Sequence, residues 1–153
     1  MNDKFEITET INRYFAALDK RTFDVETYRK IFAENATITR PNGTSMAGPV
    51  ELSSSHTQSL ERFKATQTLT SGFIIDLADE SNADFRVNLV AMHLWKVGLG
   101  DPNVSQQDNY FLAGGVVSGS VINTSNGWCI LKIRNDIIWR QGVGFQEMLL
   151  NTK

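Results

Sequence analysis

The sequence contains few of the residues from which disulfides and metal sites are built. Its 153 residues include one cysteine, Cys129, and two histidines, His56 and His93. A single cysteine cannot form a disulfide within the chain, and one thiol with two imidazoles is too few for the usual four-ligand zinc site. The sequence therefore predicts neither a disulfide framework nor a metal site.

Long apolar runs and runs of one charge are also missing. No stretch approaches the roughly 20 apolar residues that a membrane span needs, and the first residues are polar, unlike a signal peptide. The 15 Lys and Arg and 17 Asp and Glu residues give a net charge of −2, without a basic run that could follow a phosphate backbone. We therefore expect a cytoplasmic protein with neither membrane nor nucleic acid as a partner.

The composition is that of a folded globular chain. Hydrophobic residues make up 41% and charged residues 21%, which excludes the low hydrophobicity and charge excess of a disordered chain. The length suits one hydrophobic core, and the sequence has no internal repeat and no linker. We therefore expect a single domain over residues 1–153.

Apolar residues recur at helical spacing early in the chain and at strand spacing later. Helices are expected at residues 3–20, 22–35 and 49–63, with a small hairpin that begins at 36–40 between the last two. Strands are expected at residues 66–78, 84–97, 108–123 and 127–140. This order predicts an α+β fold in which three N-terminal helices pack on a strongly curved antiparallel sheet.

One of these strands brings a histidine to the inner face of the sheet. The odd positions of residues 84–97 form an apolar row whose one polar member is His93: Phe85, Val87, Leu89, Ala91, His93, Trp95 and Val97. An imidazole buried there without a partner costs about 1–3 kcal/mol, so it needs a hydrogen bond. Asp19 is the candidate partner, since it lies at the C-terminal end of the first helix, where the helix dipole disfavours a carboxylate.

An aspartate and a histidine in an apolar pocket can form a general base. The aspartate fixes the tautomer of the ring and stabilises the imidazolium, while the histidine removes a proton from the substrate. A core histidine with a satisfied hydrogen bond is the alternative, and spacing alone leaves both open.

The other notable residues have structural interpretations. His56, in a serine-rich helix, is expected to be exposed or capping, and Cys129 an inert sheet residue. The pair Gly114-Gly115 is expected to kink a strand, and Trp128 and Trp139 are expected to pack rather than to stack on a ligand.

Several short motifs resemble the SnoaL-like branch of the nuclear-transport-factor-2-like superfamily. The opening helix ends in Tyr14 and Asp19 at the family spacing, and a family-like segment at residues 31–36 leads into the first strand. Further matches occur in the family's order at Gly48, 63–67, 91–93, Phe111, Gly114-Gly115, 127–130 and Arg134. The resemblance covers about residues 5–140, and the joint order of the motifs carries it.

This resemblance implies a cone-shaped α+β barrel around a pocket for a small hydrophobic ligand. Family enzymes include polyketide cyclases and relatives of scytalone dehydratase, which need neither metal nor organic cofactor. Carried over by position, Asp19 and His93 are the expected catalytic residues. The expected ligand-binding residues are Tyr14, Phe15, Leu18, Thr68, Leu89, Ala91, Trp95 and Val117.

The sequence also departs from the dehydratase pattern. Thr68 stands where many family members have the histidine that acts as the principal acid and base, and a threonine cannot take a proton at neutral pH. Leu18 replaces a tyrosine of the dehydratase site, and Val117 and Gly119 replace a Tyr and an Asp.

Two functions follow. The first is a cofactor-free dehydratase, isomerase or cyclase that acts on an apolar or aromatic, polyketide-like or steroid-like, substrate through Asp19 and His93. The second is a non-catalytic ligand-binding or interaction module of the same fold. In either case we expect a homodimer formed through the outer sheet face, because Val90, Met92 and Leu94 would otherwise leave an apolar strip in water.

Overall fold

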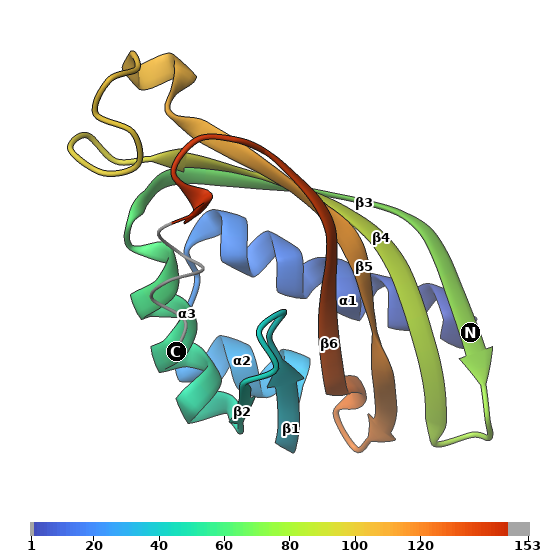
Figure 1. The fold of residues 1–153 in the computed structure, drawn as a ribbon. Coiled ribbons are helices and arrows are strands. Elements are labelled where there is room, and N and C mark those ends of the chain that lie inside the picture. Colours follow the sequence, from blue (N-terminus) through green and yellow to red (C-terminus); the bar gives the residue numbers. More distant parts are fainter. Residues whose placement is uncertain (1, 147–153) are drawn as a thin grey trace.

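The computed structural model describes residues 2–146 and shows helices beneath an arched sheet (Figure 1). The helices are α1 (Asp3–Lys20), α2 (Val25–Ile31) and α3 (Pro49–Leu60), with a short 3-10 helix η1 (Gln106–Asp108). The strands are β1 (Phe32–Thr39), β2 (Ser45–Ala47), β3 (Phe63–Leu77), β4 (Asn82–Trp95), β5 (Tyr110–Thr124) and β6 (Gly127–Gly142). The expected three helices and curved sheet are confirmed.

The six strands form one sheet in the order β2-β1-β6-β5-β4-β3. Strands β3 to β6 are an antiparallel meander, as the sequence predicted, and β1 and β2 form the expected hairpin. β1 lies parallel to β6, with Ile38 opposite Ile133, a pairing that the sequence did not indicate. In Figure 1, α1 crosses the concave side of the long strands, so the helices cover the inner face.

Helix α1 follows from an apolar stripe at helical spacing. Ile7, Ile11, Tyr14 and Phe15 on this stripe are buried. The helix begins after Asn2, whose side chain accepts a hydrogen bond from a first-turn amide, and ends at Arg21 in the left-handed conformation, with φ of 63°.

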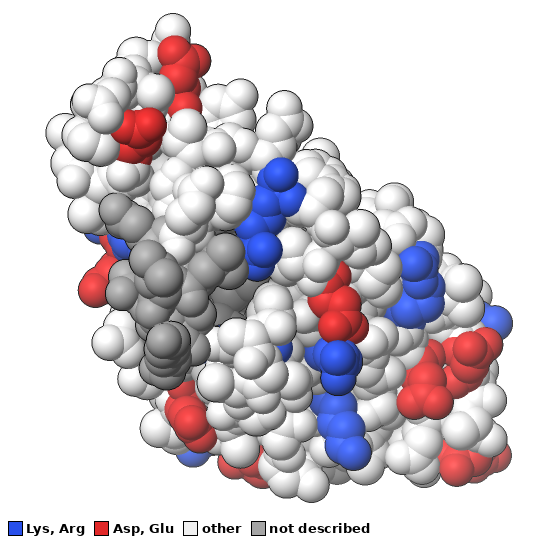
Figure 2. Space-filling view, in the orientation of Figure 1, with Lys and Arg blue, Asp and Glu red and all other residues white. Residues whose placement is uncertain are grey.

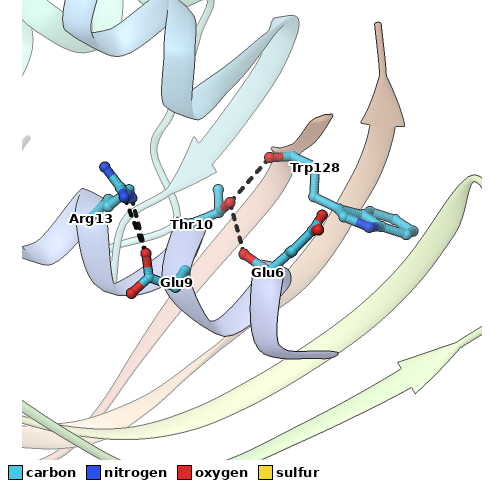
Figure 3. Close-up of polar contacts among 5 residues, drawn as sticks. All are labelled: Glu6, Glu9, Thr10, Arg13 and Trp128. Atoms are coloured by element: carbon cyan, nitrogen blue, oxygen red, sulfur yellow. Dashed lines mark hydrogen bonds and ion pairs between the residues drawn. The ribbon is translucent and has the colours of Figure 1, made fainter. Parts of the chain in front are cut away.

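Hydrogen bonds fix α1 against the beginning of β6 (Figure 3). Thr10 Oγ1 donates to the carbonyl of Trp128 at 3.2 Å. The indole of Trp128 also donates to Asp3 at 3.2 Å. The nearby ion pair between Arg13 and Glu9 is exposed, and such pairs contribute little to stability. Trp128 is thus a packing residue, as expected.

The double glycine kinks the sheet as predicted. The register between β5 and β6 shifts between Gly114 and Gly115, so that Gly114 pairs with Trp139 and Gly115 with Ile137. A Cβ atom on Gly114 would lie 2.1 Å from the Trp139 indole, so only glycine fits beneath this ring. Trp139 therefore packs on the outer face, and its side chain is 42% exposed.

Strand β4 confirms most of the predicted inner row. Phe85, Val87, Leu89 and Trp95 are buried. The expectation that Val97 continues this inner row is wrong, because β4 ends at Trp95 and Val97 is 83% exposed in the loop that follows. The polar and glycine-rich stretch after Trp95 offers no strand partner, so the apolar alternation ends one step early.

Two further features bear on possible partners. Within residues 2–146, no helix is both long and apolar enough to cross a membrane. Figure 2 shows basic and acidic side chains interspersed over the face that it views.

Candidate functional site

A cavity of about 280 Å³ lies between the helices and the concave face of the sheet. Most of its wall is apolar, and its lining side chains come from α1, α3 and strands β1 to β6. The apolar lining residues include Tyr14, Phe15, Leu18, Ile38, Met46, Leu89, Ala91, Phe111, Ala113, Val117, Ile133 and Ile137. Polar and charged side chains make up the rest of the lining and are the candidates for binding or chemistry.

Asp19 lies at the cavity and is held by the edge strand β3. Its carboxylate accepts hydrogen bonds from Thr66 Oγ1 at 3.0 Å, from the Thr68 amide at 2.7 Å and from Thr68 Oγ1 at 3.1 Å. This explains a carboxylate at the end of α1, since three donors from β3 offset the unfavourable helix dipole. Thr68 thus supplies two of the three bonds that orient Asp19.

His93 lines the same cavity from β4. Its ring stacks on Phe111, its partner across the strands, at 4.2 Å and 7° between the ring planes. This stacking fixes the plane of the imidazole. Nδ1 is buried without a hydrogen bond of good geometry, although the backbone groups of Phe111 and Ala91 lie close enough to act on the pKa of the ring. Because Nδ1 is closed off, a ligand in the cavity would reach the ring through Nε2.

Burial lowers the pKa of His93 from 6.5 to about 4. The positive charges of Arg62 and Arg21 lower it further, while the backbone groups of Phe111 and Ala91 oppose the shift. His93 is consequently a neutral imidazole at pH 7, with one lone pair able to accept a proton.

Asp19 and His93 are neighbours without a direct hydrogen bond. The bonds that Asp19 makes with described residues all go to Thr66 and Thr68. Thr66 pairs directly across the strands with His93, and such partners have Cβ atoms about 4.5–5.5 Å apart. One residue therefore links the two, and a bridging water remains a prediction.

The expectation that His56 is exposed or capping is wrong, because the residue is 8% exposed and lines the cavity. Its Nδ1 lies 2.8 Å from the Tyr28 hydroxyl and its Nε2 lies 3.3 Å from the Tyr14 hydroxyl. Burial, aided by the charge of Arg40, lowers the pKa of His56 to about 4, and burial raises the pKa of both tyrosines. One tyrosine therefore donates to the neutral ring and the other accepts from it.

Three arginines also line the cavity, from separate parts of the chain: Arg40 after β1, Arg62 before β3 and Arg140 near the end of β6. Among the described lining residues, Asp19 is the one carboxylate. Asn135 lies nearby on β6, and its Oδ1 is buried without a partner.

Seven of the eight expected ligand-binding residues line the cavity: Tyr14, Phe15, Leu18, Thr68, Leu89, Ala91 and Val117. Trp95 does not. It packs with Phe63 and Phe111 in a second buried cluster, and its indole donates to the carbonyl of Val143 at 2.9 Å. The inner row of β4 extends past the cavity, so facing inward did not suffice to place Trp95 in it.

The residues that sequence reasoning missed differ in how easily they could have been found. His56 shares a helical stripe with Pro49, Leu52 and Ser53, all buried, so its spacing pointed inward. Arg140 faces inward because the register shift opposite Gly114 and Gly115 resets the alternation of β6 after Ile137; the double glycine predicts the kink but not which side chains of β6 turn inward.

No metal site is evident among residues 2–146, where no three His, Cys, Asp or Glu side chains come close enough to hold an ion. The polar groups of the cavity supply hydrogen bonds, positive charge and two neutral imidazoles, His56 and His93.

Comparison with known proteins bears on the fold and the family. Residues 1–134 match the SnoaL-like domain family. No curated protein matches the sequence significantly.

Many solved structures share the fold, and three of them illustrate the similarity. Kfla4162 from Kribbella flavida has a TM-score of 0.82 at 19% identity, with 91% of this chain and 93% of that chain covered. A candidate scytalone dehydratase from Novosphingobium aromaticivorans has a TM-score of 0.72 at 15% identity, over 89% and 84% of the chains. A nuclear transport factor 2 (NTF2-like) superfamily protein from Salmonella enterica has a TM-score of 0.72 at 19% identity, over 93% and 95%.

Proposed function

Because the chain belongs to the SnoaL-like domain family, we propose that it is a small-molecule pocket protein that catalyses a proton transfer without a cofactor. The reaction is an elimination, an isomerisation or a ring closure on a small apolar or aromatic substrate. The observation that carries this proposal is His93, a neutral imidazole without a side-chain partner among the described residues, on the wall of a mainly apolar cavity.

In this reaction His93 accepts a proton from a carbon atom of the substrate. Its stacking on Phe111 holds the ring in one plane, which keeps the lone pair aimed at a fixed position. A base with a pKa of about 4 is weak, so the substrate must have an activated C–H bond, such as one next to a carbonyl group.

Asp19 is the fixed charge beside this base. Four lone-pair positions exist on its two oxygens, and the hydrogen bonds from Thr66 and Thr68 occupy three of them. The remaining position can accept a water that also bonds His93. Such a bridge stabilises the imidazolium that forms when His93 takes the proton.

One observation favours the non-catalytic alternative. Asp19 joins the end of α1 to β3 through Thr66 and Thr68, which is a structural role that needs no substrate. In that case the protein binds a ligand and His93 supplies a hydrogen bond to it.

Kemp elimination of 5-nitrobenzisoxazole separates these alternatives. A base removes the proton on the ring carbon, the N–O bond breaks, and the coloured phenolate that forms reports the rate. We expect turnover above that of free imidazole, rising with pH through the pKa of His93 near 4. His93→Gln should lower the rate by about 10²–10⁴-fold, whereas Lys96→Gln, an exposed change beyond β4, should not.

Equal rates for the wild-type protein and His93→Gln would leave the binding module as the function. If His56→Gln lowers the rate and His93→Gln does not, the base is the other cavity histidine.

We also infer that the outer face of the sheet forms a homodimer. Val90 and Met92 lie on this face and are partly buried, and Val90 pairs with Leu69 on one side and Gly114 on the other. Leu69 is 61% exposed and Trp139, packed on Gly114, is 42% exposed. A second copy would cover this apolar strip.

A further inference from the structure

The lining of the cavity has more positively than negatively charged side chains. Arg40, Arg62 and Arg140 line it, and Asp19 is the one carboxylate among the lining residues described. Because His56 and His93 are neutral at pH 7, the lining has an excess of positive charge. Charges at a partly enclosed apolar surface are costly unless a partner of opposite sign is near.

The three guanidinium groups have few partners among residues 2–146. Arg40 donates to Ser55 Oγ and, at 3.3 Å, to the sulfur of Met46. Arg62 donates through Nε to the carbonyl of Ser59 at 2.8 Å. Arg140 has neither a hydrogen bond nor an ion pair with a described residue, and none of the three pairs with a carboxylate there. Most of their N–H donors are thus available to a ligand.

Two of the arginines act on the same region. Arg40 lies close enough to Arg62 to lower its pKa, second to burial as a cause. Two like charges held together repel each other, so an anion between them is favoured over a neutral group. The charge of Arg62 also reaches His93, which places this region beside the proposed base.

We propose that the ligand of this cavity is an aromatic or apolar molecule with a carboxylate or similar planar anionic group, held by Arg40 and Arg62 with Arg140 beside them. A guanidinium binds a carboxylate through two parallel hydrogen bonds, which fixes orientation as well as charge. The apolar body then lies along Leu89 and Val117, and its anionic end lies on the side of the cavity that holds His93. This inference uses the cavity of the proposed function and names the class of its substrate.

Binding of 2-naphthoate and of its neutral isostere 2-naphthamide, measured by titration calorimetry, tests the inference. The two probes share one shape and differ in charge. Since hydrogen bonds to charged groups contribute about 1.5–3 kcal/mol, we expect naphthoate to bind roughly 10- to 100-fold more tightly. Arg62→Met and Arg140→Gln should each reduce this preference without changing the binding of naphthamide.

Arg134→Gln is the matched control, because it removes the same charge from the exposed outer face of β6. Equal affinity for the two probes, an equal loss in Arg134→Gln, or no saturable binding of naphthoate at millimolar concentration would each overturn the inference.

The test also distinguishes this inference from the proposed catalysis. His93→Gln should lose turnover of the neutral benzisoxazole and keep its preference for naphthoate. If the preference for the anion persists while the wild-type protein shows no turnover, the ligand class stands and the catalytic role of His93 falls. If the wild-type protein turns over the benzisoxazole but shows no preference for naphthoate, the catalytic role of His93 stands and the anionic ligand class falls.

Discussion

Mild acid should destabilise this protein through its two histidines. His56 and His93 have pKa values lowered from 6.5 to about 4 by burial, so the folded protein binds fewer protons than the unfolded chain between these values. Stability is therefore fully present above pH 6.5 and falls as the pH drops toward 4.

The size of the loss follows from these two pKa values. At pH 5 the unfolded chain has nearly fully protonated histidines and the folded protein has nearly neutral ones, which lowers the free energy of unfolding by about 2 kcal/mol for each histidine. The two together lower it by about 4 kcal/mol, a large fraction of the 5–15 kcal/mol typical of a domain. With an m-value of roughly 2 kcal/mol/M, the urea midpoint should fall by about 2 M.

Urea unfolding at pH 7, 6 and 5, followed by tryptophan fluorescence, measures this effect. His93→Gln should remove about half of the pH dependence, and the double variant with His56→Gln should remove nearly all of it. Local hydrogen bonds lower the pKa values of Asp24 and Asp79. These two carboxyl groups therefore titrate below pH 5 and do not contribute to the stability change between pH 7 and pH 5. A midpoint in the wild-type protein that does not move between pH 7 and pH 5 would refute the reasoning.

Two more outcomes are expected. Tyr28→Phe removes the hydroxyl that lies 2.8 Å from His56 Nδ1 in a buried site, and it should lower the free energy of unfolding by about 1–3 kcal/mol. Chemical denaturation measures this loss, and an unchanged free energy of unfolding would mean that water takes the place of the hydroxyl. Sedimentation at micromolar concentration should give a dimer that Leu69→Lys converts to a monomer; a wild-type monomer of 17.1 kDa would contradict the dimer.

Much of the fold could be predicted because the local and the overall patterns agree. The stripe of Ile7, Ile11 and Phe15 determined α1, and strict alternation determined the inner row of β4 up to Trp95. The parallel pairing of β1 with β6 could not be predicted, since nothing in the alternation of a strand names its neighbour.

The candidate site was only partly predictable for a related reason. Asp19 and His93 were found because each conflicts with its surroundings, a carboxylate at a helix end and an imidazole in an apolar row. The sequence did not indicate that arginines line the cavity, because an arginine in a loop or at a strand end is usually exposed. Whether such a residue faces a cavity depends on turns and bulges, as at Arg140 after the shifted register of β6.

The hydrogen bonds of Asp19 have a consequence for the association of whole molecules. β3 forms one border of the sheet, and a border strand exposes backbone donors on which a strand of another molecule can add. Here the Thr68 backbone amide donates to Asp19 at the end of α1. The side chain of Thr70 donates to the side chain of Asn12, also on α1, at 2.9 Å. Helix α1 therefore shields the border where it passes, and Asp19 belongs to that shield as much as to the cavity. A variant that loses this carboxylate uncovers the Thr68 amide, so we expect it to add strands of other molecules more readily and to aggregate more than the wild-type protein.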